Sequence, residues 1–160
     1  MLVPRHPHRF AEVASLVEQQ GWRLVRRSVG LPNDDTEVWL GDSMGEMAAY
    51  FSLADLAFVG GSLLPLGGQN LIEAAACACP VLVGPHTFNF LQATEDAIAA
   101  GAALRVANAD ELGVSVDALL RNEGRLAAMR AAANEFARAH QGAAERMLDL
   151  IERWTGRAGR

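Results

Sequence analysis

The stretch Leu56-Ala-Phe-Val-Gly-Gly-Ser62, followed after a short loop by Gly67-Gly-Gln-Asn-Leu-Ile-Glu73, decides the fold of this chain. Its apolar start, Leu56 to Val59, is typical of a buried parallel strand. The residues from Leu71 to Cys77 favour a helix. A strand, a glycine-rich loop and a helix in this order bring backbone N–H groups and the positive end of a helix dipole to one edge of a sheet. We interpret the stretch as a cradle for the phosphate of a nucleotide.

The same residues also have a purely structural interpretation. Asn70 is a good N-cap residue, and Glu73 stands three positions later, where a capping-box carboxylate reaches back to the cap. Glycine pairs are also common in ordinary loops. The stretch lacks the Gly-x-Gly-x-x-Gly pattern of dinucleotide-binding folds and the Gly-Lys-Ser/Thr of phosphate-binding loops. A nicotinamide enzyme and an NTPase are therefore disfavoured.

Composition limits the class of protein. The chain has 160 residues, 51% apolar and 21% charged, a balance typical of one soluble globular domain. Its formal net charge of -5 argues against a nucleic-acid partner. Cys77 and Cys79 are too close in sequence for an unstrained disulfide, so we expect two small buried residues in a reducing compartment. No apolar run approaches the ~20 residues that span a bilayer, and the early charges of Arg5 and Arg9 do not fit a secretory signal, so we expect a cytoplasmic protein.

Short apolar segments alternate with helical patterns along the chain. Met1–Pro4 is predicted to be the tail of a first strand, and the other predicted strands are Trp22–Ser28, Glu37–Gly41, Leu56–Val59, Pro80–Pro85 and Ala103–Val106. The predicted helices are about Phe10–Gly21, Met44–Leu53, Leu71–Cys77, Leu91–Ala100, Leu112–Leu120, Arg125–His140 and Ala143–Trp154. This alternation predicts an α/β fold, with a parallel sheet, right-handed crossovers and flanking helices, that ends in C-terminal helices.

Four polar loops follow predicted strands, where ligands bind in sheets of this kind. They are Arg5–Arg9, Gly41–Ser43, Gly60–Asn70 and Pro85–Asn89. Because the carboxyl ends of parallel strands share one edge, these loops should converge there. This convergence is the main physical argument for a binding site.

Further expectations concern caps and core. Ser43 and Glu46 have capping-box spacing, and Asp110 is predicted to cap the helix that begins at Leu112. We expect core positions for three aromatic residues, one stripe of the long helix, and one face of the last helix. They are Trp22, Trp39 and Phe136; Leu126, Met129 and Ala133; and Met147, Leu148, Ile151 and Trp154.

The loops together resemble those of one known family. The matching pieces are Val3-Pro-Arg-His-Pro7 with Arg9-Phe10, Gly41-Asp-Ser-Met-Gly-Glu46, Ala54 to Leu63, Gly67-Gly-Gln-Asn70 with Glu73, and Gly84-Pro-His-Thr-Phe-Asn-Phe90 after Pro80-Val-Leu. In order and spacing over roughly residues 2 to 90, the sequence resembles the C-terminal half of 3-deoxy-D-manno-octulosonic acid (Kdo) transferases. The later helices match weakly.

The resemblance implies a Rossmann-like domain, the C-terminal half of a GT-B glycosyltransferase, that binds the donor CMP-Kdo. By resemblance, the glycine turns hold the CMP phosphate, Glu73 takes the ribose hydroxyls, Arg5 pairs with phosphate or with the Kdo carboxylate, and Gly41 to Met44 line the cytosine pocket. The implied donor-binding residues are Arg5, His6, Gly41, Ser43, Met44, Gly60, Gly61, Ser62, Gly68, Gln69, Asn70, Glu73 and Asn89.

The resemblance also implies what this chain lacks. We expect residues 1–160 to form one donor-binding domain, with a strand-and-helix core to about residue 121 and C-terminal helices over about 122–155. The family's N-terminal domain, with its membrane anchor, acceptor site and catalytic base, is expected to belong to a longer parent protein. That parent would transfer Kdo to lipid A precursor in lipopolysaccharide biosynthesis at the cytoplasmic face of the bacterial inner membrane, without a metal or other cofactor. This chain alone would bind the donor and transfer nothing.

Alternatives stay open. The chain fits the donor half of another GT-B glycosyltransferase or of a nucleotide-sugar epimerase, or a stand-alone nucleotide-binding module. His6, His8 and His86 could together be read as metal ligands, but no Cys or carboxylate cluster joins them, so we expect no metal site and interpret His6 and His86 as hydrogen-bonding residues of the anion site. Two positions depart from the family pattern, with His8 where members often carry Glu and Leu71 where many carry Pro. The arginines from Arg121 onward suit a solvated helical face or, alternatively, anionic lipid headgroups.

Overall fold

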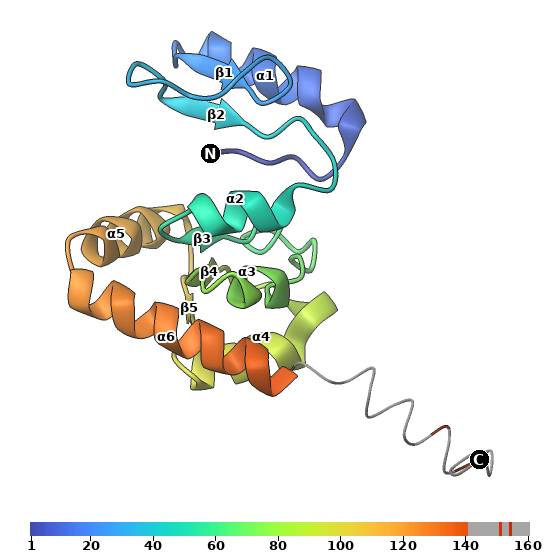
Figure 1. Cartoon of the computed structure of the whole chain (residues 1–160), viewed down its shortest axis with the longest axis vertical. Helices are drawn as coiled ribbons and strands as arrows, with labels where there is room; N and C mark the ends of the chain where they lie inside the picture. Colours follow the sequence, from blue (N-terminus) through green and yellow to red (C-terminus); the bar gives the residue numbers. More distant parts are fainter. Residues whose placement is uncertain (141–150, 152–153, 155–160) are drawn as a thin grey trace, which may run out of the picture. The chain divides into compact units, whose positions relative to one another are not determined.

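A computed structural model gives the fold of the chain and describes residues 1–140, 151 and 154. The structure is α/β, with parallel strands flanked by helices (Figure 1). Contacts divide the chain into two compact units, Met1–Tyr50 and Phe51–Arg160. Each unit is described by itself.

The first unit contains a small parallel sheet and one long helix. A 3-10 turn, η1 (Pro7–Arg9), leads into α1 (Phe10–Gln19), which is followed by β1 (Leu24–Arg26) and β2 (Val38–Leu40). β1 and β2 pair in parallel, and Leu2 adds an isolated parallel bridge to Leu40. The chain passes into the second unit within α2 (Met47–Leu53).

The second unit contains a three-stranded parallel sheet in the order β3-β4-β5. Its strands are β3 (Ala57–Phe58), β4 (Val81–Val83) and β5 (Ala103–Arg105). Helices and one 3-10 turn connect and cover the strands. They are α3 (Ile72–Ala76), η2 (Phe88–Phe90), α4 (Leu91–Ala99), α5 (Ala109–Leu120) and α6 (Glu123–His140).

The strands and helices predicted between residues 10 and 140 are present, whereas the predicted helix Ala143–Trp154 falls outside the described residues; the sheet is divided. Sequence alternation predicted one parallel sheet, whereas the described strands form a two-stranded and a three-stranded sheet. The first segment contributes the single bridge residue Leu2, which pairs with Leu40 of β2, rather than a full strand.

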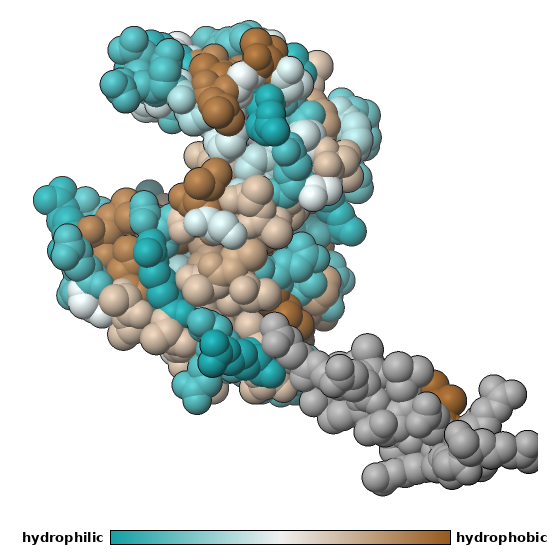
Figure 2. Space-filling model, in the orientation of Figure 1, coloured by the Kyte–Doolittle hydropathy of each residue, from teal (hydrophilic) through white to brown (hydrophobic). Residues whose placement is uncertain are grey.

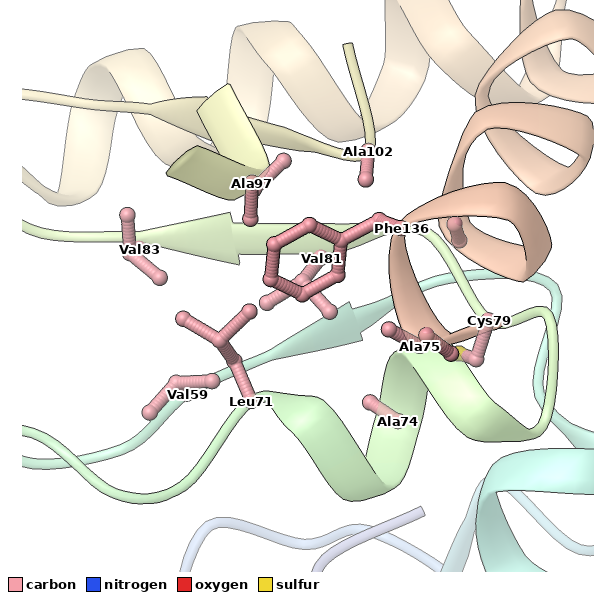
Figure 3. Packing of buried hydrophobic residues seen from close by; sticks show 13 residues of the cluster. Val59, Leu71, Ala74, Ala75, Cys79, Val81, Val83, Ala97, Ala102 and Phe136 are labelled. Carbon is pink, nitrogen blue, oxygen red and sulfur yellow. The ribbon is translucent and has the colours of Figure 1, made fainter. Parts of the chain in front are cut away.

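The core of the second unit lies between the sheet and the helices α3 and α6. Phe136 of α6, 4% exposed, packs with Val81 of β4 and with Leu71, which is 1% exposed (Figure 3). Burying an aromatic ring and a leucine this fully stabilises the fold by about 1.5–3 kcal/mol for each side chain. Leu71, which departs from the family's proline, is therefore a core residue. In the predicted stripe of α6, Met129 and Ala133 are also buried.

Three predicted core positions are wrong. Trp22 is 53% exposed, because it lies in the turn between α1 and β1, beyond the buried face of the helix. Ile151 and Trp154 are 51% and 90% exposed, while Met147 and Leu148 of the same predicted face lie outside the described residues. Other large hydrophobic side chains are also exposed, and Figure 2 shows brown residues among teal ones on the surface of each unit.

Three helix starts differ from the prediction. Asn108, not Asp110, caps α5, since its side chain accepts a hydrogen bond from the backbone N–H of Glu111 at 2.9 Å. The N-cap residue of α3 is Leu71 rather than Asn70. α2 begins at Met47, so Glu46 precedes it, and the Ser43 hydroxyl bonds the Glu46 carboxylate instead of forming a backbone capping box.

Candidate functional site

The carboxyl ends of β3, β4 and β5 meet at one edge of the second unit's sheet, because the three strands are parallel. The loop after β3 carries Gly60, Gly61 and Ser62 and continues to Asn70. The loop after β4 runs from Gly84 to η2. The structure therefore brings the two glycine turns and the predicted Asn89 to the same edge.

Ser62 joins the first turn to the loop after β4. Its side chain is fully buried, with Oγ donating a hydrogen bond to the Val59 carbonyl at 2.5 Å and accepting one from the Gly84 N–H at 2.8 Å. Its backbone carbonyl accepts a hydrogen bond from the His86 N–H at 2.9 Å. The Ser62 side chain is thus engaged within the protein.

Gly67 and Gly68 form the second glycine turn in left-handed conformations, with φ of +87° and +71°. The Gly68 N–H donates to the Gly61 carbonyl at 3.2 Å, which connects the two glycine pairs. Asn89 closes the turn from the other side, since its N–H donates to the Gly67 carbonyl at 3.2 Å and its Nδ2 to the Leu66 carbonyl at 3.3 Å. Only glycine combines this backbone conformation with such close neighbours.

Asn70 and Glu73 lie at the start of α3. The Asn70 Oδ1 accepts a hydrogen bond from the Ile72 N–H at 3.0 Å, and its Nδ2 lies 3.5 Å from the Glu73 carboxylate. Asn70 thus satisfies one of the unpaired N–H groups of the helix start, although it is not the N-cap residue. Glu73 is exposed, and Gln69 is half-buried. Because α3 is only five residues long, its dipole is small, and the loop backbone is the stronger source of donors.

Gly41 lies directly after β2 in the first unit, where there is no room for a side chain. A Cβ at this position would lie 2.9 Å from the Tyr50 ring and 3.0 Å from Val3. The Gly41 N–H donates to the Leu2 carbonyl at 2.8 Å. Because Leu2 and Leu40 run parallel, the Arg5–His6 turn and the segment after Gly41 lie at the same edge of this small sheet.

A polar network surrounds Ser43 in the first unit. The Ser43 hydroxyl contacts the Glu46 carboxylate and lies 2.6 Å from the Tyr50 hydroxyl, while Arg27 donates to Glu46 at 2.9 Å. The hydrogen bond from Ser43 and the nearby Arg27 guanidinium hold the pKa of Glu46 below its usual value. The Ser43 side chain therefore helps to organise this loop.

Asp42, next to Gly41, holds the ends of β1 and β2 together. Its side chain is 1% exposed and accepts hydrogen bonds from the Ser28 N–H at 2.8 Å, the Ser28 hydroxyl at 2.6 Å and the Arg26 Nε at 2.8 Å. Burial acts to raise the pKa of this carboxyl, but the hydrogen bonds from Ser28 and Arg26 outweigh it, so the pKa lies below its usual value. Asp42 stays ionised at neutral pH.

The remaining predicted residues of the first unit are on its surface. Arg5, His6 and Met44 are exposed. The His6 ring stacks on His8, with centroids 5.5 Å apart. Within residues 1–140, 151 and 154, no group of three or more His, Cys, Asp or Glu side chains is placed to hold a metal ion. No helix among the residues that the structure describes has the length and apolar character to cross a membrane.

Three residues at the edge of the three-stranded sheet are absent from the predicted donor-binding set. Gly84 has no space for a Cβ, Thr87 is buried, and Arg105 donates to the Thr87 hydroxyl at 3.4 Å and to Glu95 at 2.9 Å. The Nε of Arg105 is buried and has no hydrogen-bond partner among the described residues. Gly84 stands in the quoted Gly-Pro-His motif, which is a usable signal, whereas nothing in the sequence marks Arg105.

Comparison with known proteins identifies the relatives of this chain. No family model matches the sequence. The chain is 50% identical over 158 residues to 3-deoxy-D-manno-octulosonic acid transferase from Bordetella pertussis, a match that covers 98% of this chain and 37% of the relative. It is 42% identical over 154 residues to the transferase of the same name from Haemophilus influenzae, covering 95% of this chain and 36% of the relative. The chain thus spans little more than a third of the length of these curated relatives.

A solved structure matches both the fold and the sequence. The C-terminal CMP-Kdo binding domain of WaaA from Acinetobacter baumannii superposes with a TM-score of 0.79 at 34% sequence identity, over 84% of this chain and 72% of that domain. The predicted α/β fold class is confirmed. The chain belongs to the 3-deoxy-D-manno-octulosonic acid transferase family and corresponds to the C-terminal domain of its members.

Proposed function

We propose that this chain is the domain that binds the nucleotide-sugar donor CMP-Kdo in a Kdo transferase. The observation that carries the proposal is the likeness, at 34% identity, to a domain named for CMP-Kdo binding. The glycine turns at the carboxyl edge of β3-β4-β5 support it, because their backbone is close-packed and tied in place before any ligand arrives. A preorganised loop of this kind holds an anion without a further ordering cost.

The predicted donor-binding residues suit different parts of the donor. The backbone of Gly60, Gly61 and Gly68 to Asn70 would face the CMP phosphate, where small residues permit close approach. The exposed Glu73 carboxylate, an acceptor only, would take the ribose hydroxyls. Arg5, with His6, would pair with the phosphate or the Kdo carboxylate, since a guanidinium binds two oxygens at once.

The residues from Gly41 to Met44 would line the cytosine pocket, while Asn89 would act through the Gly67 turn that it closes. We further propose that residues 1–160 act as one donor-binding domain. Its contribution to transfer is electrostatic, because backbone donors and arginine stabilise the negative charge of the departing CMP.

We propose that the parent protein supplies what these residues do not. The base that deprotonates the acceptor hydroxyl, and the site for lipid A precursor, would belong to another domain. The parent would work at the cytoplasmic face of the bacterial inner membrane, in lipopolysaccharide biosynthesis. The domain alone would bind the donor and transfer nothing.

Calorimetry with CMP, UMP and 2′-deoxy-CMP tests the proposal on the full chain. Wild type should prefer CMP over UMP and over 2′-deoxy-CMP. Glu73→Gln should weaken CMP binding about tenfold, the equivalent of one charge-assisted hydrogen bond, and should abolish the preference for CMP over its deoxy analogue. Glu135→Gln, an exposed position on α6, is the matched control and should bind like wild type.

The outcomes separate the alternatives. Absence of CMP binding would refute donor binding, and equal binding of UMP would favour a GT-B domain that uses another nucleotide sugar. An amide NMR titration with CMP gives the location, because the largest shifts should fall between Gly68 and Glu73. Shifts elsewhere only would contradict the assignment of the phosphate cradle.

A further inference from the structure

Ser62 uses its only hydroxyl proton and one of its two lone pairs inside the protein. The side chain is 0% exposed, its single O–H donates to Val59, and its oxygen accepts the Gly84 N–H. A serine hydroxyl has one proton to donate and two lone pairs. A ligand at the surface therefore has no access to this hydroxyl.

The backbone around Ser62 forms a second connection to the same loop. The His86 N–H donates to the Ser62 carbonyl at 2.9 Å, two residues beyond the Gly84 contact. Gly84 approaches so closely that a Cβ there would lie 2.3 Å from the Ser62 carbonyl oxygen. The turn after β3 and the turn after β4 are thus in direct backbone contact.

The second glycine turn depends on the same arrangement. A Cβ on Gly68 would lie 3.7 Å from the Ser62 Cβ and 3.5 Å from the His86 carbonyl oxygen, so Gly68 packs between these two residues. Three loop segments therefore meet at the buried serine. The spacing of the backbone groups assigned to the donor phosphate depends on this contact.

We propose that Ser62 is a positioning residue, which fixes the two glycine turns and the Gly84–His86 segment relative to one another without touching the donor. The proposal deepens the proposed function and rests on it, and it replaces the place among the donor-binding residues that the family resemblance implied for Ser62. Removal of the hydroxyl leaves the buried Gly84 N–H without a partner, which favours a shift of the loop.

The test combines a local readout that needs no ligand with a binding readout. In wild type, the Gly84 and His86 amides should be protected from hydrogen exchange as strongly as those of β4. Ser62→Ala should accelerate exchange at both amides and weaken CMP binding about tenfold, as expected for one lost hydrogen bond. Val17→Ala is the control, because Val17 is buried on α1 in the first unit and belongs to neither of the two turns nor to the predicted donor-binding residues. It should lower stability while leaving CMP affinity and the two amides unchanged.

Several results would overturn the proposal. The proposal is wrong if the Gly84 and His86 amides of wild type exchange as fast as those of exposed loops. This result needs no variant, so it holds even if Ser62→Ala does not fold. Unchanged exchange in Ser62→Ala, together with a loss of affinity for CMP but not for cytidine, would indicate a direct phosphate contact instead. A wild-type chain that does not bind CMP would refute the proposed function, while the exchange data would still decide whether Ser62 fixes the turns.

Discussion

Replacement of Gly84 by alanine is the sharpest test of how the candidate site is built. The added Cβ would lie 2.3 Å from the Ser62 carbonyl oxygen, 2.4 Å from its carbonyl carbon and 2.6 Å from the Leu63 nitrogen. All three are backbone atoms, so no side chain can rotate away to relieve the contact. The turn after β3 must move as a whole.

The cost follows from what that movement breaks. The 2.8 Å bond from the Gly84 N–H to the Ser62 hydroxyl and the 2.9 Å bond from the His86 N–H to the Ser62 carbonyl both cross the contact. Overpacking of a close-packed site together with the loss of these hydrogen bonds should lower the free energy of unfolding by about 2 to 5 kcal/mol. CMP affinity should fall as well, because the displaced turn belongs to the proposed phosphate cradle.

Urea unfolding followed by circular dichroism measures the change, with calorimetry for CMP. Gly113→Ala is the control, since no atom lies within 4 Å of its added Cβ and the residue stands within α5. There the exchange of glycine for alanine should stabilise the helix by roughly 0.5–1 kcal/mol. A Gly84→Ala protein as stable as wild type, with unchanged affinity, would refute the close contact between the two turns.

Three further predictions concern other parts of the chain. Since the folded-state pKa of Asp42 lies below the usual value of 3.8, its ionised form stabilises the fold above that pH, and this stability is lost as the pH falls through the lower folded-state value. Asp42→Asn should lower the free energy of unfolding by about 1–3 kcal/mol at pH 7. The stability of this variant should also fall less steeply with decreasing pH than that of wild type. If urea unfolding between pH 7 and 2 shows the same pH dependence of stability for both proteins, the prediction is wrong. Asn108→Ala should lower the free energy of unfolding by about 1 kcal/mol because the α5 cap is lost, whereas Asn108→Asp keeps a capping side chain and should not. Thermal unfolding measures both variants, and equal melting temperatures would argue against the cap. Gly67→Ala should cost about 1–2 kcal/mol because its φ is +87°. Its Cβ would also displace Asn89, whose Nδ2 lies 2.3 Å away, so an unmoved Asn89 amide signal in NMR would be inconsistent with the structure.

Much of the fold could be predicted because its signals are local. Apolar runs such as Val81 to Val83 and the periodic spacing of Met129, Ala133 and Phe136 report burial directly, and the structure buries all of these residues. Sheet membership could not be predicted in the same way. It depends on whether distant segments pair, and Leu2 contributes only one bridge to β2.

The candidate site was predicted as a set of loops but not in the roles of its side chains. The family motifs indicated the glycine turns. In the structure, the turn at Gly67, in the loop after β3, is hydrogen-bonded to Asn89. A motif cannot tell a residue that faces a ligand from one that faces the protein, which is why Ser62 was assigned to the phosphate. Capping errors have a similar cause, since both Asn108 and Asp110 suit an N-cap and only the backbone conformation at Asn108, φ −156° and ψ −178°, decides between them.

The two cysteines differ in a way that is useful at the bench. Burial raises the pKa of Cys79 to about 11, whereas Cys77, at the end of α3, is partly exposed. A maleimide dye at mildly alkaline pH should therefore react at Cys77 and spare Cys79, because the thiolate is the reactive form. The sequence thus provides a single attachment point for a fluorescent reporter, directly after the short helix that contains Glu73.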